Sequence, residues 1–310
     1  MRRALIAVAA LVALGAGSAS AGVRLAPAKR IVPPPNARWQ YQLQASQRGD
    51  ARSGRVNVDI CSRPFAGGPG CVRPKVIDFD LYLPKRGVPI DSTPNRGAVR
   101  ALHRRGGYAI CYVDAGSIES YRPDFPRFVR WNRRHGHSLL GKPFSPIFND
   151  ERYANIGGKR QRAFLLRMMG RRVGRCRRAG FDAVEFDVVD SWQTPKRVSG
   201  WRISYRDQIA YNRSLARIGH RNGLAVGLKN DLEQIPDLIH DFDFAIDEQC
   251  FQYHECNRLE RFVDAGKPVF EVEYRLTPAE FCPQAAALGF DAIRKAHNFS
   301  LHDEPFRPCS

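Results

Sequence analysis

The stretch Gly180-Phe-Asp-Ala-Val-Glu-Phe-Asp-Val-Val-Asp190 decides the fold, and a helical pattern over residues 160–179 precedes it. A glycine directly after a helix supplies the left-handed residue that ends it. The short apolar run 183–189 that follows has the length of a buried strand. A similar unit occurs at Gly289-Phe-Asp-Ala-Ile293. Units of helix, glycine and strand are typical of a parallel sheet built from alternating strands and helices.

On both sides of this stretch, the same alternation of predicted helices and strands continues over most of the chain. Capping signals predict further helices from Ser204 to about Arg221 and from Thr277 to Gly289. Eight short apolar runs predict strands over residues 39–43, 76–82, 108–113, 183–189, 224–228, 242–246, 269–274 and 290–293. Eight strands in a chain of this length favour a single closed (β/α)8 TIM barrel over an open doubly wound sheet.

Two long loops interrupt the alternation of strands and helices. They cover residues 60–75 after the first strand and 114–159 after the third. Loops that follow barrel strands lie on the catalytic face, so we expect both to shape a substrate cleft.

The first residues have the features of an export signal. Two arginines precede an apolar run over residues 4–16, and Ala19-Ser-Ala21 is a small-residue cleavage site. The predicted organisation is therefore a signal peptide over 1–21, a Pro-rich arm over 22–38 and the barrel over 39–310. Because no other run approaches the length of a membrane span, we expect no stable membrane insertion. The protein is expected to be secreted, extracellular or in the cell envelope, and monomeric.

Eight cysteines in an exported chain favour disulfides. Their spacing predicts three local pairs, which are Cys61–Cys71, Cys250–Cys256 and Cys282–Cys309. Cys111 in a predicted strand and Cys176 in a predicted helix either pair or remain as small buried side chains. Because no Cys–x–x–Cys motif or zinc-like His/Cys spacing occurs, no metal site and no cofactor are predicted.

The formal net charge is +18. A basic surface attracts anionic partners. However, the basic residues are distributed along many segments, without one block interleaved with aromatics, so they indicate a generally basic solvated surface. No nucleic-acid partner is expected, although binding of nucleic acid or of an anionic envelope polymer remains the alternative.

Acidic side chains recur two residues apart in three predicted strands, with apolar residues between them. Residues two apart in a strand share a face, and the helix-facing side of a barrel strand must be apolar. These acids should therefore point into the barrel. They are Asp78 with Asp80, Glu185 with Asp187, and Glu271 with Glu273.

Further polar residues, namely Asp190, Lys229, Asn230 and Glu248, fall at or just after strand ends. Acids lining the mouth of a barrel indicate glycosidase chemistry with two carboxylates. Structural carboxylates, or a calcium or magnesium site, are the alternatives.

Several motifs resemble glycoside hydrolase family 114, the endo-α-1,4-polygalactosaminidases. They are Ile110-Cys-Tyr-Val-Asp-Ala-Gly-Ser-Ile-Glu-Ser-Tyr-Arg-Pro-Asp124, the stretch 180–190, Leu224-Ala-Val-Gly-Leu-Lys-Asn-Asp231 and the stretch 242–256. The resemblance spans residues 39–295 and implies a secreted TIM barrel that cleaves α-1,4-linked galactosamine polymers without a cofactor.

The resemblance also implies roles for individual residues. Asp187 and Glu248 match the catalytic pair of the family. Asp190, Tyr112, Glu119, Arg122, Lys229 and Asn230 match other motif positions and would line the cleft, beside Asp80 and Glu273 from the strand pattern. Strict alternation in residues 242–248 places Asp247 on the face of Ala245, so Asp247 is the alternative to Glu248.

The predicted function is thus endo-acting hydrolysis of a galactosamine-type polysaccharide. The alternatives are a carbohydrate-binding barrel without catalysis and a hydrolase of a different, anionic glycan.

Overall fold

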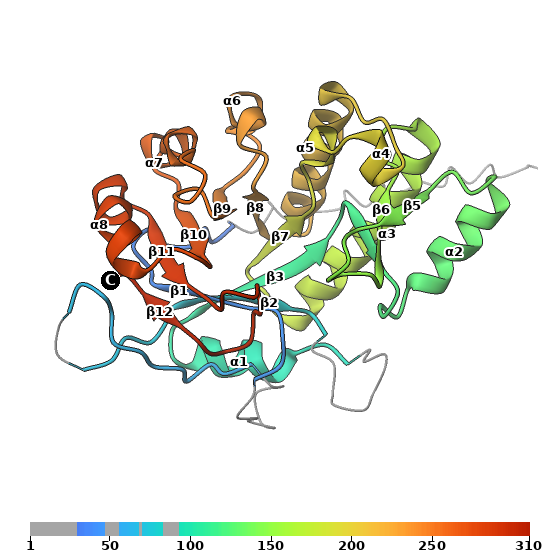
Figure 1. Ribbon diagram of the computed structural model, residues 1–310. Helices are drawn as coiled ribbons and strands as arrows, with labels where there is room; N and C mark the ends of the chain where they lie inside the picture. Colours follow the sequence, from blue (N-terminus) through green and yellow to red (C-terminus); the bar gives the residue numbers. More distant parts are fainter. Residues whose placement is uncertain (1–29, 47–55, 68–69, 83–92) are drawn as a thin grey trace, which may run out of the picture.

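Eight parallel strands form the barrel that the sequence predicts (Figure 1). The structure, a computed structural model, describes residues 30–46, 56–67, 70–82 and 93–310. The predicted signal peptide and the first part of the arm lie outside these residues. The barrel strands, in sheet order, are β1 (Trp39–Gln42), β2 (Val76–Asp80), β3 (Tyr108–Asp114), β7 (Ala183–Asp187), β8 (Ala225–Lys229), β9 (Phe244–Glu248), β10 (Val269–Glu273) and β11 (Asp291–Arg294). A short antiparallel strand, β12 (Arg307–Pro308), pairs with β11.

The barrel is nearly closed, with a seam between β1 and β11. No backbone ladder joins these strands within the described residues, although Cα atoms of the two come within 8 Å. Side chains bridge the seam. The backbone N–H of Ala37 donates to the Asp291 carboxylate over 3.2 Å, and the Lys295 ammonium donates to Gln40 Oε1 over 3.1 Å. The seam therefore depends on side chains from both ends of the chain.

Helices cover the outside of the barrel, and their predicted ends are confirmed. Helix α3 (Lys159–Ala179) ends at Gly180 with φ +101°. Helix α5 (Tyr205–Arg221) begins after Ser204, whose hydroxyl accepts the backbone N–H of Asp207, and α8 (Pro278–Leu288) begins with the Thr277 capping box and ends at Gly289. The other helical segments are α1 (Arg96–Arg104), α4 (Lys196–Ser199), α6 (Ile235–Leu238), α7 (Glu260–Asp264), η2 (Ser191–Gln193), η3 (Leu232–Gln234) and η4 (Cys256–Arg258).

The loop after β3 is a folded unit of its own. It contains helix α2 (Phe125–Arg134) and an antiparallel sheet in the order β4 (Ser117–Glu119), β6 (Glu151–Ala154) and β5 (Leu140–Pro143). By contrast, the disulfide-closed part of the loop after β1 packs against the C-terminal segment. The backbone N–H of Phe65 donates to the Pro308 carbonyl over 2.9 Å.

All eight cysteines form disulfides, and the three local pairs are confirmed. Cys111 and Cys176, whose state the sequence left open, are also joined. This bridge attaches β3 to α3, and the two cysteines are 65 positions apart in the sequence.

The barrel interior corrects the predicted orientation of two strands. The inner cluster contains Phe244 and Ile246 of β9 together with Phe270 and Val272 of β10. Glu271 and Glu273 therefore lie on the outer face of the barrel, not on the inner face as predicted. The reason is steric, because the large rings of Phe244 and Phe270 fill the interior. Gly227 of β8 leaves room for them, since a Cβ there would lie 2.4 Å from the Phe244 ring.

The described residues contain no helix of sufficient length and hydropathy to cross a bilayer.

Candidate active site

A cleft of about 830 Å³ lies at the carboxyl ends of the barrel strands. One wall is the folded loop after β3, which contributes Tyr121, Phe144 and Phe148, and the opposite wall includes Leu43 and Phe299. Eight of the ten predicted site residues line this one cleft, namely Asp80, Tyr112, Arg122, Asp187, Asp190, Lys229, Asn230 and Glu248. The structure thus brings together residues from β2, β3, β7, β8, β9 and the loops that follow them.

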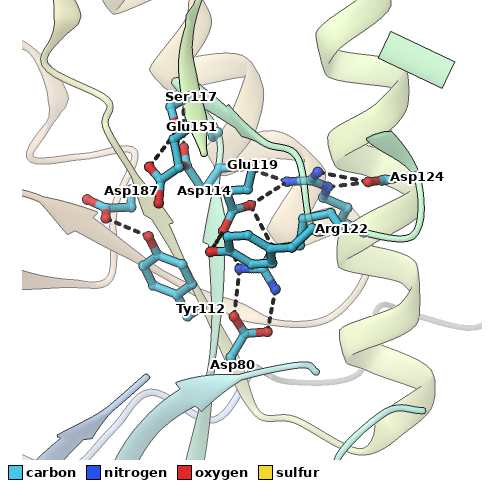
Figure 2. Close-up of polar contacts among 12 residues, drawn as sticks. Asp80, Tyr112, Asp114, Ser117, Glu119, Arg122, Asp124, Glu151 and Asp187 are labelled. Carbon is cyan, nitrogen blue, oxygen red and sulfur yellow. Dashed lines mark hydrogen bonds and ion pairs between the residues drawn. The ribbon is translucent and has the colours of Figure 1, made fainter. Parts of the chain in front are cut away.

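Asp187 is the last residue of β7 and is held from three sides. The Tyr112 hydroxyl donates to Asp187 Oδ2 over 2.8 Å (Figure 2). The backbone N–H of Val188 donates to Oδ1 over 2.8 Å. Val188 itself has φ +56°, a left-handed conformation that is costly for a β-branched residue. The Asp187 carbonyl accepts the backbone N–H groups of Ala115 and Gly116 over 3.1 and 3.2 Å. The carboxylate is therefore fixed in direction.

Glu248 is the last residue of β9 and points to the same mouth. The Tyr274 hydroxyl donates to Glu248 Oε1, and the backbone N–H of Glu248 donates to Asn230 Oδ1 over 3.1 Å. Glu248 shares the inner face with Phe244 and Ile246, so the predicted conflict with strand alternation does not arise. Asp247, the alternative, is buried on the other face and does not line the cleft.

Lys229, the last residue of β8, lies between the two carboxylates. Its Nζ is 3.3 Å from Asp187 Oδ1 and 3.1 Å from Glu248 Oε2. It also lies 3.4 Å from Glu185 Oε1 and 3.1 Å from the Tyr41 hydroxyl. Burial lowers the pKa of Lys229, but the carboxylates of Asp187, Glu248 and Glu185 raise it by more, so the pKa lies well above its ordinary value. The ammonium therefore remains charged and joins the pair.

The inward acids below the mouth, Asp78 and Glu185, are fully buried. Glu185 accepts a hydrogen bond from the Tyr41 hydroxyl over 3.0 Å. Burial, and then the charge of Glu185, raise the pKa of Asp78 well above its ordinary value. Burial also raises the pKa of Glu185, and the charge of Lys229 opposes that effect. The positions of Asp78 and Glu185 confirm the inward orientation predicted for β2 and β7.

A buried ion network fixes the loop after β3 to the barrel (Figure 2). The Arg122 guanidinium donates to Asp80 Oδ1 over 2.6 Å and to Glu119 Oε2 over 2.7 Å. Arg172 of α3 binds both carboxylate oxygens of Asp124, over 2.9 and 3.0 Å. Asp80 and Arg122 line the cleft, whereas Glu119 lies behind its wall. The guanidinium of Arg122 is thus already bound to protein carboxylates.

Glu273, also predicted at the site, does not line the cleft. Its Oε1 accepts the backbone N–H groups of Phe251 and Gln252, each over 3.0 Å. These residues belong to the loop that directly follows Glu248. The physical effect of Glu273 is therefore to hold that loop from the outer face of the barrel.

Other cleft residues differ in how they are held. Asp190 lines the cleft, and burial followed by the charge of Asp187 raises its pKa to about 6. Asn230 has φ +49°, and Gln249 after Glu248 has φ +68°. Left-handed residues therefore follow Asp187, Lys229 and Glu248 directly, at the ends of three adjacent strands. Backbone strain of this kind concentrates at functional sites.

Sequence reasoning missed three cleft residues that contact the site. Tyr41 was assigned only to a strand, although its position two residues after the inward Trp39 was an available signal. Tyr274 was predicted only as the last residue of the strand 269–274, not as the donor to Glu248. Glu151 lines the cleft wall and accepts a hydrogen bond from the Ser117 hydroxyl over 3.0 Å. Burial and the charge of Asp114 raise the pKa of Glu151 to about 9. No local pattern in the sequence indicated it.

Two groups of side chains in the described residues are close enough to share a cation. In Asp247, Cys250 and Glu271, the sulfur is part of a disulfide and offers no thiolate. In Asp114, Glu119 and Glu151, both Glu119 oxygens already bind Arg122, and the Ser117 hydroxyl contacts the other two carboxyl groups. We assign neither group as a metal centre.

Comparison with known proteins agrees with this geometry. The model of glycoside-hydrolase family GH114 matches residues 20–310. The crystal structure of Aspergillus fumigatus Ega3 in complex with galactosamine is similar to this chain, with 26% identity and a TM-score of 0.66, over 89% of this chain and 96% of that one. The glycoside hydrolase domain of PelA from Pseudomonas aeruginosa shares the fold, with 14% identity and a TM-score of 0.55, over 88% and 98% of the two chains. No protein with a curated description matches the chain.

Proposed function

This chain belongs to glycoside-hydrolase family GH114, and we propose that it cleaves α-1,4-linked galactosamine polymers within the chain, with Asp187 and Glu248 as the catalytic carboxylates. The observation that carries this proposal is the position of Lys229 between the two acids. One fixed ammonium contacts both carboxylates at the mouth of the barrel, 3.3 and 3.1 Å away. Glycosidases act through such a pair, one acid protonating the leaving oxygen and the other attacking or activating water.

The separation of the two carboxylates supports a particular stereochemical course. Asp187 Oδ1 and Glu248 Oε2 both contact Lys229 Nζ, so these two oxygens are at most about 6.4 Å apart, which allows the roughly 5–5.5 Å separation of retaining enzymes. A pair this close leaves little room for a water between acid and sugar. We therefore propose that one carboxylate attacks the sugar directly and that the anomeric configuration is retained.

The charge of the cleft supports an amino-sugar substrate. The protein has a net charge of +18, which would repel a polycation at long range. The cleft, however, is lined by six carboxyl groups. Glu151, whose pKa is about 9, carries no charge at pH 7, and the other five are Asp80, Asp150, Asp187, Asp190 and Glu248. Its Arg122 and Lys229 are both engaged in ion pairs with carboxylates. Inside the cleft the local acids act at short range, where salt screens them less than it screens the distant surface charge. The galactosamine bound to Ega3 agrees with this substrate class.

Release of reducing ends from galactosamine polymers tests the proposal. Asp187→Asn and Glu248→Gln preserve the shape of the side chains, and each should lower turnover at least about 10³-fold, because removing one member of a catalytic unit costs most of its effect. Asp264→Asn on α7 serves as a control, since that exposed carboxylate lies outside the cleft. Retention of turnover in both site variants contradicts the catalytic assignment.

A substrate panel separates the competing functions. Binding of galactosamine polymers without release of reducing ends would indicate a carbohydrate-binding barrel. Hydrolysis of uronate polymers in preference to galactosamine or N-acetylgalactosamine polymers would indicate an anionic substrate. Export through the segment 1–21 and a monomeric state remain part of the proposal. The four disulfides support export, because such bonds persist in oxidising compartments.

A further inference from the structure

The basic residues are less evenly distributed than the sequence suggests. Helices α2 and α3 together contain 31 residues, of which 13 are Lys or Arg and none is Asp or Glu. The two helices contact each other, because Trp131 of α2 stacks on Phe164 of α3 with ring centroids 5.0 Å apart. One side of the molecule (right in Figure 1) thus has two neighbouring helices rich in positive charge, of which Arg162 and Arg172 are paired with carboxylates outside the helices.

Four arginines form a straight line along α3. Arg160, Arg167, Arg171 and Arg178 are spaced by seven, four and seven residues, so at 100° per residue they lie within about 20° of one line, over roughly 27 Å. All four side chains are exposed, and none forms an ion pair with a described residue. On the inner side of the same helix, Arg172 is buried and paired with Asp124. Apart from the guanidinium of Arg167, which lies 5.8 Å from the centre of the Phe164 ring, no contact within the described residues accounts for these exposed arginines.

Helix α2 extends this surface. Arg127, Arg130, Arg133 and Arg134 are exposed, on the side of the helix opposite the buried Phe128. We call the line on α3 together with these four residues the arginine face. The cleft residues do not include any member of the arginine face, so the face is separate from the proposed active site.

The chemistry of the arginine face indicates which class of ligand it binds. A guanidinium group binds phosphate oxygens through two parallel hydrogen bonds. Among the exposed residues of α2 and α3, Val129 is the one large apolar side chain, too little to enter a bilayer, and neither helix has an exposed aromatic ring on which an unpaired base could stack. Recognition is thus limited to a charged backbone. Among phosphodiester polymers, duplex DNA has the highest charge density, one charge per about 1.7 Å, and so gains most from counterion release.

We infer that the arginine face is a docking surface for the phosphate backbone of double-stranded DNA, bound without sequence preference. This inference does not depend on the proposed hydrolase activity. It revises the expectation of a generally basic solvated surface, since the exposed arginines of α3 lie on one line along the helix and α2, which contacts α3, carries four more.

Binding of a labelled DNA duplex of mixed sequence, measured against salt concentration, tests the inference. The variant Arg160→Gln, Arg167→Gln, Arg171→Gln, Arg178→Gln should reduce the slope of log K against log salt by about 3–4, since each phosphate contact contributes about 0.9. The matched control removes four exposed arginines that lie outside α2 and α3, Arg63, Arg73, Arg261 and Arg307, each changed to Gln. Both variants lose the same net charge, and the control should lose far less of the slope.

Two outcomes would contradict the inference, one from the comparison of the variants and one from the comparison of ligands. Equal weakening by both variants would mean that only net charge matters, with no docking face. Tighter binding, at the same salt, to single-stranded DNA, to a uronate polymer or to vesicles of anionic lipid would exclude duplex DNA as the preferred partner. Hydrolysis of a short soluble oligosaccharide should be unchanged in the α3 variant, which would confirm that its fold and cleft are intact.

Discussion

Gly116 lies against the backbone carbonyl of Val188, so closely that a Cβ on Gly116 would sit 1.6 Å from that oxygen. Both residues flank the same carboxylate. The N–H of Gly116 donates to the carbonyl of Asp187, and the N–H of Val188 donates to its side chain. The turn after β3 therefore fixes the direction of a side chain on β7.

Gly116→Ala should lower kcat by about 10²-fold, because the added methyl group must push the Val188 peptide and displace Asp187 by a fraction of an ångström or more. The stability loss should be about 1–3 kcal/mol, typical of an overpacked site. Gly170→Ala is the control, since a Cβ at that position in α3 meets no atom within 4 Å. It should be neutral or raise stability by up to about 1 kcal/mol. Steady-state kinetics and thermal unfolding measure both. Full activity of Gly116→Ala would show that the turn does not control Asp187.

Lys229→Met should destabilise the fold by about 3–5 kcal/mol, because it leaves buried carboxylates without their cation. Glu185→Gln in the same chain should recover part of this loss, since Glu185 Oε1 lies 3.4 Å from Nζ and its negative charge is then unbalanced. A double-mutant cycle by denaturant unfolding gives the coupling between the two residues. Simple additivity of the two changes would mean that Glu185 does not compensate Lys229.

Asp190→Asn should raise the melting temperature at pH 7 by at least about 2 °C. The pKa of Asp190 is raised to about 6 in the folded protein. The folded state therefore holds the proton more tightly than the unfolded chain, and the ionised form at neutral pH opposes folding. The difference between variant and wild type should shrink as pH falls through 6 and disappear below about pH 4, where the unfolded side chain is protonated as well. A difference that is constant from pH 4 to pH 8 would exclude this origin.

The first product released should have the α configuration at its new reducing end, as retention requires. Proton NMR during the first minutes of hydrolysis distinguishes the two anomers before they equilibrate. Initial appearance of the β anomer would instead indicate inversion, and a water between Asp187 and Glu248.

Removal of the Cys111–Cys176 disulfide by paired substitution to Ala should cost about 4 kcal/mol, because the bond closes a loop of 65 residues. The same change at Cys250–Cys256, which spans 6 residues, should cost only about 2 kcal/mol on the same chain-entropy relation. Denaturant unfolding of the two variants compares them directly. Equal losses would show that local packing, not loop closure, dominates both bonds.

Local patterns determined the architecture and part of the site. Helices and strands follow from hydrophobic periodicity and from caps such as Gly180, Ser204 and Thr277, whose effects extend over only a few residues. The inward acids of β2 and β7 were predictable because each alternates with apolar residues that must face the helices. The identity of Asp187 and Glu248 as candidates came from motif resemblance.

The faces of β9 and β10 were not predicted correctly, because both strands are buried on both sides and the alternation visible in β10 does not say which set of residues faces the interior. In β9, Phe244, Ala245 and Ile246 are all apolar, and a strand covered on both faces shows no alternation. Only the packing of Phe244 against Phe270 and over Gly227 decides that Glu248 points to the mouth and Glu273 to the outside.

The sequence by itself thus determined the barrel, its helix ends, three of its disulfides and the inward acids of two strands, since short-range sterics and periodicity govern these features. Only the tertiary structure decided that Lys229 lies between Asp187 and Glu248 and that Arg122 is bound by Asp80 and Glu119. These contacts join residues 3, 19 and 42 positions apart along the chain and from different strands and loops, so their distances depend on how the whole barrel closes.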